Sequence, residues 1–173
     1  WDLKTQKQTV VFRGYAEPTA LAFSPDGKTL ATVGRSEPVG NPKRDLDDGV
    51  IRLCDVSTGK ERANLICSTP ELNVGWLDRL HFSPNGKRLW AGRANGEHYV
   101  WNAETEQLVT DAPGGYPFVF SPDSKLLATS GDKDLLRLRE AETGKEKSTL
   151  APKGNALALS HNGQVLAAKT EKR

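Results

Sequence analysis

The residues best able to carry out chemistry are the three histidines and the serine nearest to one of them. His81 and His98 fall in predicted strands and His161 in a predicted turn, and no Cys, Asp or Glu stands at metal-ligand spacing from any of them. His81 and Ser83 could place a base beside a nucleophile, but Ser83 opens a turn that recurs along the chain, so a structural role explains it. We therefore expect packing or surface roles for these residues, and neither catalysis nor a metal.

Three further motifs are too incomplete to indicate a site. The spacing of Cys54 and Cys67 matches no metal or redox motif, so two free thiols are expected. Residues 132–134 (Asp-Lys-Asp) resemble part of a calcium loop but lack its glycine and its distal glutamate. Gly114 and Gly115 stand in no phosphate-loop context. The sequence thus predicts no bound cofactor.

The composition narrows the kinds of partner. The 173 residues include 24 Lys and Arg and 22 Asp and Glu, a net charge of +2, which is too balanced to indicate nucleic acid or a membrane surface. No apolar run approaches the ~18–20 residues of a membrane span, and the N-terminus lacks a signal-peptide pattern. Trp1 rather than Met opens the sequence, so we expect a piece of a longer protein. We expect that protein to be cytoplasmic. Sixteen Gly and ten Pro favour an all-β fold with many turns.

One ten-residue pattern recurs four times and organises the chain. It begins at Phe23 (Phe-Ser-Pro-Asp-Gly-Lys-Thr-Leu-Ala-Thr) and returns at Phe82, Phe120 and Leu159. Each copy reads as a hairpin, with an apolar strand, a Ser-Pro-Asp-Gly turn and a second strand. The four leading residues are predicted to be buried anchors. Ser124 replaces the glycine in the third copy, and because a non-Gly residue with positive φ costs about 1 kcal/mol, we expect that turn to be looser or of another type.

A second pattern recurs in phase with the first. Residues 50–60, 97–107 and 135–145 each read as a third strand, a turn and the start of a fourth, and residues 1–7 hold a truncated copy. Together the two patterns resemble the WD-repeat family of β-propellers. Trp1-Asp2 matches the pair that closes a repeat's third strand, and Ser-Pro-Asp-Gly-Lys and Thr-Gly-Lys match its turns.

The resemblance implies an all-β fold, a β-propeller built of four-stranded antiparallel blades. The chain holds about four blades' worth of sequence and is expected to be part of a larger propeller. Residues 1–14 would end one blade, 15–65 would form a blade with an insertion at 35–46, and 66–110 and 111–150 would form two more. Residues 151–173 would then begin another blade.

The chain departs from the family at the buried tetrad of His, Ser, Trp and Asp. The Gly-His pair expected before the first strand is absent, and the Trp position holds Trp1, Cys54, Trp101 and Arg139. The tetrad therefore cannot form in full in any blade, and the blades must rest on apolar packing. Because a buried cation needs a partner, Arg139 is predicted to reach solvent or to pair with a nearby carboxylate.

Two interruptions of the repeat indicate a binding surface. The first whole blade is twelve residues longer than its successors, which places the extra residues at 35–46, and the connection that follows it is lengthened around 66–75. In a propeller, the second-to-third-strand loop and the connection between blades emerge on the same face. We therefore expect a loop rim of 35–46 and 66–77 that binds a protein or peptide. The candidate contact residues are Arg35, Glu37, Lys43, Arg44, Leu72, Trp76 and Arg79. The alternative is a pair of neutral surface insertions, with Trp76 packed against its own blade.

Three kinds of function stay open at this point. The leading hypothesis is a non-catalytic scaffold or protein–protein interaction module. The alternative is the regulatory or sensory propeller portion of a larger enzyme, such as a bacterial kinase. A propeller enzyme with a central active site would need converging acidic or histidine side chains where its first strands begin. Those positions hold Thr19, Arg79, Tyr116 and Asn155, which do not form such a set.

Overall fold

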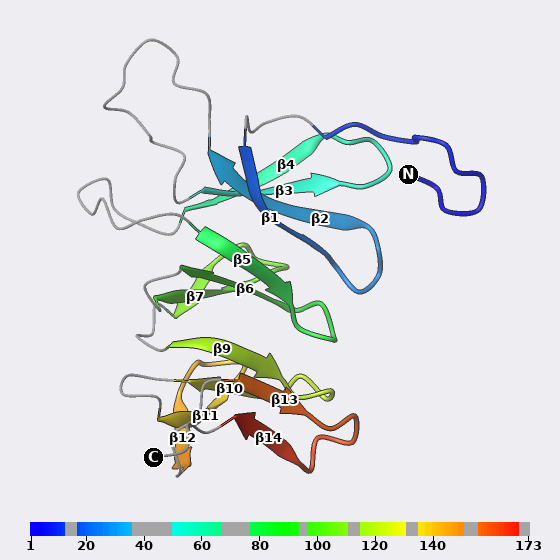
Figure 1. Ribbon diagram of the computed structural model, residues 1–173. Coiled ribbons are helices and arrows are strands. Elements are labelled where there is room, and N and C mark those ends of the chain that lie inside the picture. Colours follow the sequence, from blue (N-terminus) through cyan, green and yellow to red (C-terminus); the bar gives the residue numbers. More distant parts are fainter. Residues whose placement is uncertain are drawn as a thin grey trace. The chain divides into compact units, whose positions relative to one another are not determined.

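Antiparallel strands make up the regular structure of the chain (Figure 1). The computed structural model describes residues 1–12, 17–35, 50–66, 77–93, 97–110, 115–130, 135–150 and 156–169. Within these ranges there is no helix, and hence none that is long and apolar enough to cross a membrane. The chain divides into two compact units, 1–80 and 81–173. The expectation of an all-β chain of four-stranded antiparallel sheets is confirmed.

The first unit contains one complete sheet, whose strands pair in the order in which they follow one another along the chain. Its members are β1 (Glu17–Phe23), β2 (Thr29–Arg35), β3 (Val50–Asp55) and β4 (Glu61–Ile66). The side chains of Val33, Ile51, Leu53 and Leu65 are buried in it. Four neighbouring strands in a meander are what the WD-repeat pattern predicts for one blade.

The second unit begins inside β5 (Leu77–Phe82), which is followed in its sheet by β6 (Arg88–Arg93), β7 (His98–Asn102) and β8 (Leu108–Thr110). The next sheet has β9 (Gly115–Phe120), β10 (Leu126–Ser130), β11 (Leu136–Glu140) and β12 (Glu146–Leu150). A two-stranded sheet of β13 (Ala156–Leu159) and β14 (Leu166–Lys169) follows.

The repeated turns share one backbone geometry. Positive φ angles of 56° to 73° occur at the fourth residue of the Ser-Pro-Asp-Gly turns and at the equivalent residue of the third-to-fourth-strand turns. These residues are Gly27, Gly86, Ser124 and Gly163, and Gln6, Gly59, Glu106 and Gly144. The two predicted patterns therefore correspond to two recurring turns, including the truncated copy at the N-terminus, where Asp2 bridges Lys7.

A side-chain oxygen closes each first turn. In the first copy the Ser24 hydroxyl donates to Asp26 Oδ1 at 2.6 Å, and the Lys28 amide donates to the same oxygen at 3.0 Å. The hydrogen bond from Ser24 holds the pKa of the Asp26 carboxyl below its ordinary value. Asn85 and Asn162 accept the same two bonds in their turns, because only one oxygen is needed.

The expectation of a looser turn at Ser124 is wrong. Its φ is 59°, and its amide donates to Ser121 O at 2.8 Å, just as Gly86 donates to Ser83 O in the preceding copy. The Ser124 side chain is buried, and its hydroxyl accepts a hydrogen bond of 3.0 Å from the Asn85 amide in the neighbouring sheet. This bond, which glycine cannot make, offsets the cost of the left-handed conformation.

Aromatic stacking joins the sheets of the second unit. Trp90 on β6 stacks on Phe118 of β9 with ring centroids 3.5 Å apart, and Phe120 lies in the same core. The Trp90 ring lies over Gly92, where an added Cβ would come within 2.1 Å of the ring. In the other copies alanine stands at the Trp90 position, so this large side chain is a feature of one blade, and Gly92 makes room for it.

The predicted anchors differ in burial. Phe120 is buried at 9% exposure, and Phe82 and Leu159 are half-buried. The prediction is wrong for Phe23, which is 60% exposed. Phe23 lies on a face of β1 that no other sheet of its own unit covers among the described residues.

Candidate functional site

The candidate rim residues fall mostly outside the described ranges. Arg35 is the last residue of β2, and Arg79 lies in β5. The other five candidates lie in segments that the structure does not describe: Glu37, Lys43, Arg44, Leu72 and Trp76. The rim therefore stays a prediction, and the described strand ends beside it are what can be examined.

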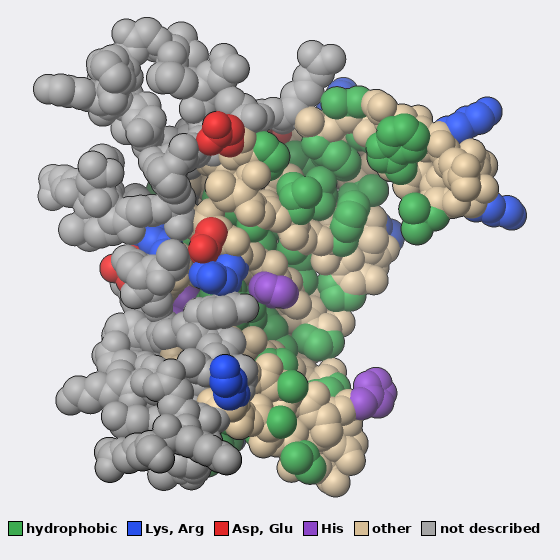
Figure 2. Space-filling view, in the orientation of Figure 1, with side chains coloured by type: hydrophobic (Ala, Val, Ile, Leu, Met, Phe, Trp, Pro, Cys, Tyr) green, Lys and Arg blue, Asp and Glu red, His purple; other side chains and the backbone are tan. Residues whose placement is uncertain are grey.

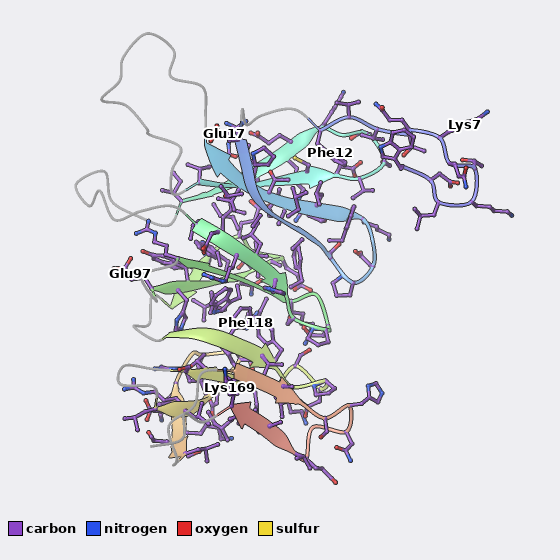
Figure 3. The ribbon with its side chains drawn as sticks, viewed as in Figure 1. Lys7, Phe12, Glu17, Glu97, Phe118 and Lys169 are labelled. Carbon is purple, nitrogen blue, oxygen red and sulfur yellow. The ribbon has the colours of Figure 1, made fainter. Side chains whose placement is uncertain are left out.

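The strand ends that adjoin the two insertions lie at the same end of the first sheet. Glu17 pairs with Arg35, which joins the start of β1 to the end of β2. Val50 pairs with Ile66, which joins the start of β3 to the end of β4. Figure 3 labels Glu17 at this end of β1.

A polar contact brings the start of β5 to the same place. β1 has a bulge between Pro18 and Ala20, and the Thr19 hydroxyl there donates to Leu77 O at 2.7 Å, with Val33 O at 3.2 Å. Bulges change the direction of a side chain at the end of a strand. The first residue of β5, which follows the second interruption, is thereby attached to β1 and β2.

The described part of this end carries charges of both signs. Arg79 Nη1 lies 2.8 Å from Asp78 Oδ1, and both side chains are partly exposed. Glu17, at the start of β1 in the same unit, is exposed. A partly exposed pair of this kind contributes about 0–1 kcal/mol to stability.

The described Ser, His and Cys side chains that could carry out chemistry take part in turns and packing instead. Within the described ranges, no three His, Cys, Asp or Glu side chains lie close enough to hold a metal ion. The Ser83 hydroxyl is buried, donating to Asn85 Oδ1 at 2.8 Å and accepting from the Arg88 amide at 3.0 Å, so it closes a turn as predicted. His98 is buried against Trp90, at 5.8 Å between ring centroids. Cys54 is a free, buried thiol, and burial raises its pKa.

Arg139 was predicted to reach solvent or to pair with a nearby carboxylate, and it pairs with the carboxylate of Glu146. Its side chain is 7% exposed, and Nη1 donates to Gly144 O at 3.0 Å while Nη2 lies 3.8 Å from Glu146 Oε2. Arg137 lies 3.7 Å from the same carboxylate oxygen. Burial lowers the pKa of Arg139, and the charge of Glu146 opposes that shift. Thr129, opposite Arg137 in the sheet, has a buried hydroxyl with no hydrogen-bond partner in the described structure, in keeping with the missing tetrad.

Comparisons with known proteins agree with the repeat pattern. The family model described as "WD domain, G-beta repeat" matches residues 6–55. The chain is 27% identical over 173 residues to COMPASS component SWD2 of Saccharomyces cerevisiae, covering 93% of this chain and 49% of that protein. It is 26% identical over 149 residues to WD repeat-containing protein SL1-17 of Schistosoma mansoni, covering 84% and 44%. It is 29% identical over 114 residues to a guanine nucleotide-binding protein subunit beta of Oryza sativa subsp. indica, covering 63% and 27%. The chain thus spans about half or less of the length of these relatives.

Proposed function

We propose that the chain is a WD-repeat β-propeller and a non-catalytic scaffold that binds a protein or peptide partner, on the support of the matched repeat and the WD-repeat relatives. The relatives support a protein partner, since one is named as a component of the COMPASS complex and another as a subunit of a guanine nucleotide-binding protein. Neither nucleic acid nor a membrane is proposed as a partner, because the charges nearly balance.

The proposed binding surface is the rim of residues 35–46 and 66–77. It is supported by the register of the first sheet, because the ends of β2 and β4 and the start of β3 lie together. The Thr19 contact with Leu77 adds the start of β5 to this group. Two inserted segments that join the same end of one sheet can present a continuous contact surface. Arg and Trp, both among the candidate residues, are enriched at the centres of such surfaces.

The proposal includes action in the cytoplasm. Support comes from the free thiol of Cys54, since reducing compartments keep thiols unpaired. The alternative is that the chain is the regulatory or sensory propeller portion of a larger enzyme, such as a bacterial kinase.

Selection of binders from a displayed peptide library on the folded chain tests the rim. We expect Trp76→Ala and Arg79→Ala each to weaken the selected peptides by at least about tenfold, as truncation of an interface anchor does. Lys60→Ala is a matched control, because Lys60 is exposed in the same unit at the opposite end of β3 and β4. Equal affinity in all four proteins would refute the rim and leave the two segments as neutral insertions.

A further inference from the structure

Two of the four turns that follow the leading residues contain asparagine followed by glycine. They are Asn85-Gly86 and Asn162-Gly163, and a third such pair, Asn95-Gly96, lies outside the described residues. When glycine follows asparagine, its backbone nitrogen can attack the asparagine side chain, because glycine has no Cβ that shields this nitrogen. The attack converts asparagine into aspartate. The turn of Asn85 is informative because the sheets on both sides of it, β5–β8 and β9–β12, are described.

The turn holds the Asn85 side chain over its own backbone. Asn85 Oδ1 accepts a hydrogen bond of 2.8 Å from the Ser83 hydroxyl and one of 3.0 Å from the Lys87 amide. Because the oxygen reaches the amide two residues ahead, the carboxamide carbon Cγ lies beside the Gly86 nitrogen that precedes that amide. Asn85 is exposed, so water reaches the side chain. Figure 2, drawn in the orientation of Figure 1, shows the turn between β5 and β6 on the right-hand side of the surface.

Two hydrogen bonds of the backbone oppose the attack. The Gly86 amide donates to Ser83 O at 2.8 Å, so its nitrogen must leave that bond before it can reach Cγ. The Asn85 amide donates to Ser124 Oγ in the neighbouring sheet at 3.0 Å. Since the attack requires rotation of the Asn85 backbone, a bond that fixes this backbone against the turn between β9 and β10 slows it. The first bond recurs in the other copies of the turn, whereas the second depends on a serine hydroxyl.

Ser124 occupies its position at a conformational cost. Its φ is 59°, and glycine stands at the equivalent position in the other three copies. The serine side chain is 8% exposed, and its hydroxyl is the acceptor for the Asn85 amide. A glycine would remove the strain of the positive φ but also the acceptor. The residue that this turn favours less than glycine is therefore the one that restrains Asn85.

An aspartate at this position fits the same turn. Asp26 and Asp123 stand there in the first and third copies, and each accepts the same two hydrogen bonds that Asn85 accepts. In both turns the bond from the serine hydroxyl holds the pKa of the carboxyl below its ordinary value, so the carboxylate is charged at neutral pH. Conversion of Asn85 to aspartate therefore lowers the formal net charge of +2 by one and keeps the backbone of the turn.

We propose that Asn85 modifies itself and that Ser124 sets the rate. First, the Gly86 nitrogen bonds to Asn85 Cγ, the Cγ–Nδ2 bond breaks, and the amide proton leaves with Nδ2 in ammonia. Water then adds to Cγ of the cyclic imide, the bond from Cγ to the Gly86 nitrogen breaks, and that nitrogen regains a proton, which leaves aspartate. Addition of water at the other imide carbonyl gives isoaspartate, whose longer backbone does not match the turn. The hydrogen bond between Asn85 and Ser124 opposes the first step and so governs the formation of both products.

Incubation of the folded chain in mildly alkaline water labelled with heavy oxygen tests this proposal, because every converted asparagine takes up the label. Mass spectrometry of proteolytic peptides, with fragmentation, assigns the label to single residues. Asn102 is an internal control, since its Oδ1 also accepts two turn amides, at 2.9 and 3.0 Å, but alanine follows it. We expect Asn85 to react faster than Asn102. Ser124→Gly should speed the reaction of Asn85 by about fivefold, which corresponds to the loss of one hydrogen bond of ordinary strength, and should leave the rate at Asn162 unchanged.

Ser124→Gly introduces the residue of the other three copies, and urea unfolding followed by circular dichroism shows whether it keeps the stability of the wild type. Ser124→Ala lacks the same acceptor and should raise the rate at Asn85 as well. A rate at Asn85 no higher than at Asn102 would overturn the proposal, as would a rate that neither Ser124 variant raises. Equal acceleration of Asn85 and Asn162 in Ser124→Gly would also overturn it, because general loosening of the fold would then be the cause.

Discussion

Replacement of Glu146 by Gln should destabilise the second unit more than an ordinary surface ion pair would. Glu146 Oε2 lies 3.8 Å from Arg139 and 3.7 Å from Arg137, and Arg139 is 7% exposed. Removing one partner of a fully buried pair costs about 3–5 kcal/mol. The Glu146 side chain is 40% exposed, so water screens the pair, and we expect a loss of about 1–2 kcal/mol.

The first sheet offers a matched control at the same repeat position. Arg52 lies 3.7 Å from Glu61 across β3 and β4, as Arg137 does from Glu146 across β11 and β12. Cys54 stands where the sheet of β9–β12 has Arg139. Glu61→Gln therefore removes a surface pair without leaving a buried cation, and should cost about 0–1 kcal/mol.

Urea unfolding followed by tryptophan fluorescence measures both losses. A third variant, Arg139→Leu, removes the buried cation, and in that background Glu146→Gln should cost no more than Glu61→Gln. If Glu146→Gln in the wild type costs no more than Glu61→Gln, the burial of Arg139 has no energetic consequence, and the reasoning is refuted.

Three further predictions concern single contacts. Gly92→Ala should cost about 1–3 kcal/mol in urea unfolding, because the new Cβ meets the Trp90 ring, and the loss should be smaller in a Trp90→Ala background. Ser124→Ala should cost about 0.5–1.5 kcal/mol by losing the bond from Asn85, whereas Ser124→Gly should be nearly neutral, since relief of the positive φ compensates; equal losses would contradict this account. Contact with Phe118 partly buries the His81 imidazole, and this burial lowers its pKa below the ordinary 6.5. Because the unfolded chain then binds more protons at His81 than the folded chain does, the free energy of unfolding should fall as the pH drops below 6.5. His81→Gln should flatten that dependence in urea titrations at a series of pH values.

The strand order and the turns could be predicted because they depend on local residue types. Pro, Asp or Asn, and Gly determine the first turn through φ preferences and one acceptor oxygen, and these residues can be read directly from the repeats. Ser124 shows the limit of such reading. The free-energy cost of its positive φ can be predicted from the local sequence, but the hydrogen bond that compensates for it comes from Asn85 in another sheet.

Burial was harder to predict, because it depends on what packs against a residue. Phe23 and Phe120 begin the same pattern, yet one is exposed and the other buried. The partner of Arg139 shows the same difficulty, since Glu146 is identified only when the register of β11 and β12 is known. A comparison of the copies could have drawn attention to Trp90, because the other copies have alanine at that position. The rim was predicted from spacing, and only Arg35 and Arg79 among its candidates lie in described strands.

The oxygen that closes each first turn has a consequence for how these repeats evolve. Asp26, Asn85, Asp123 and Asn162 accept the same two hydrogen bonds, so exchange between Asp and Asn changes the charge of the turn without changing its shape. These positions require an acceptor oxygen but not a charge, so the two residue types can replace each other. The four turns therefore share one geometry although two of them carry Asp and two carry Asn, so turn conformation identifies the repeats more consistently than residue identity does.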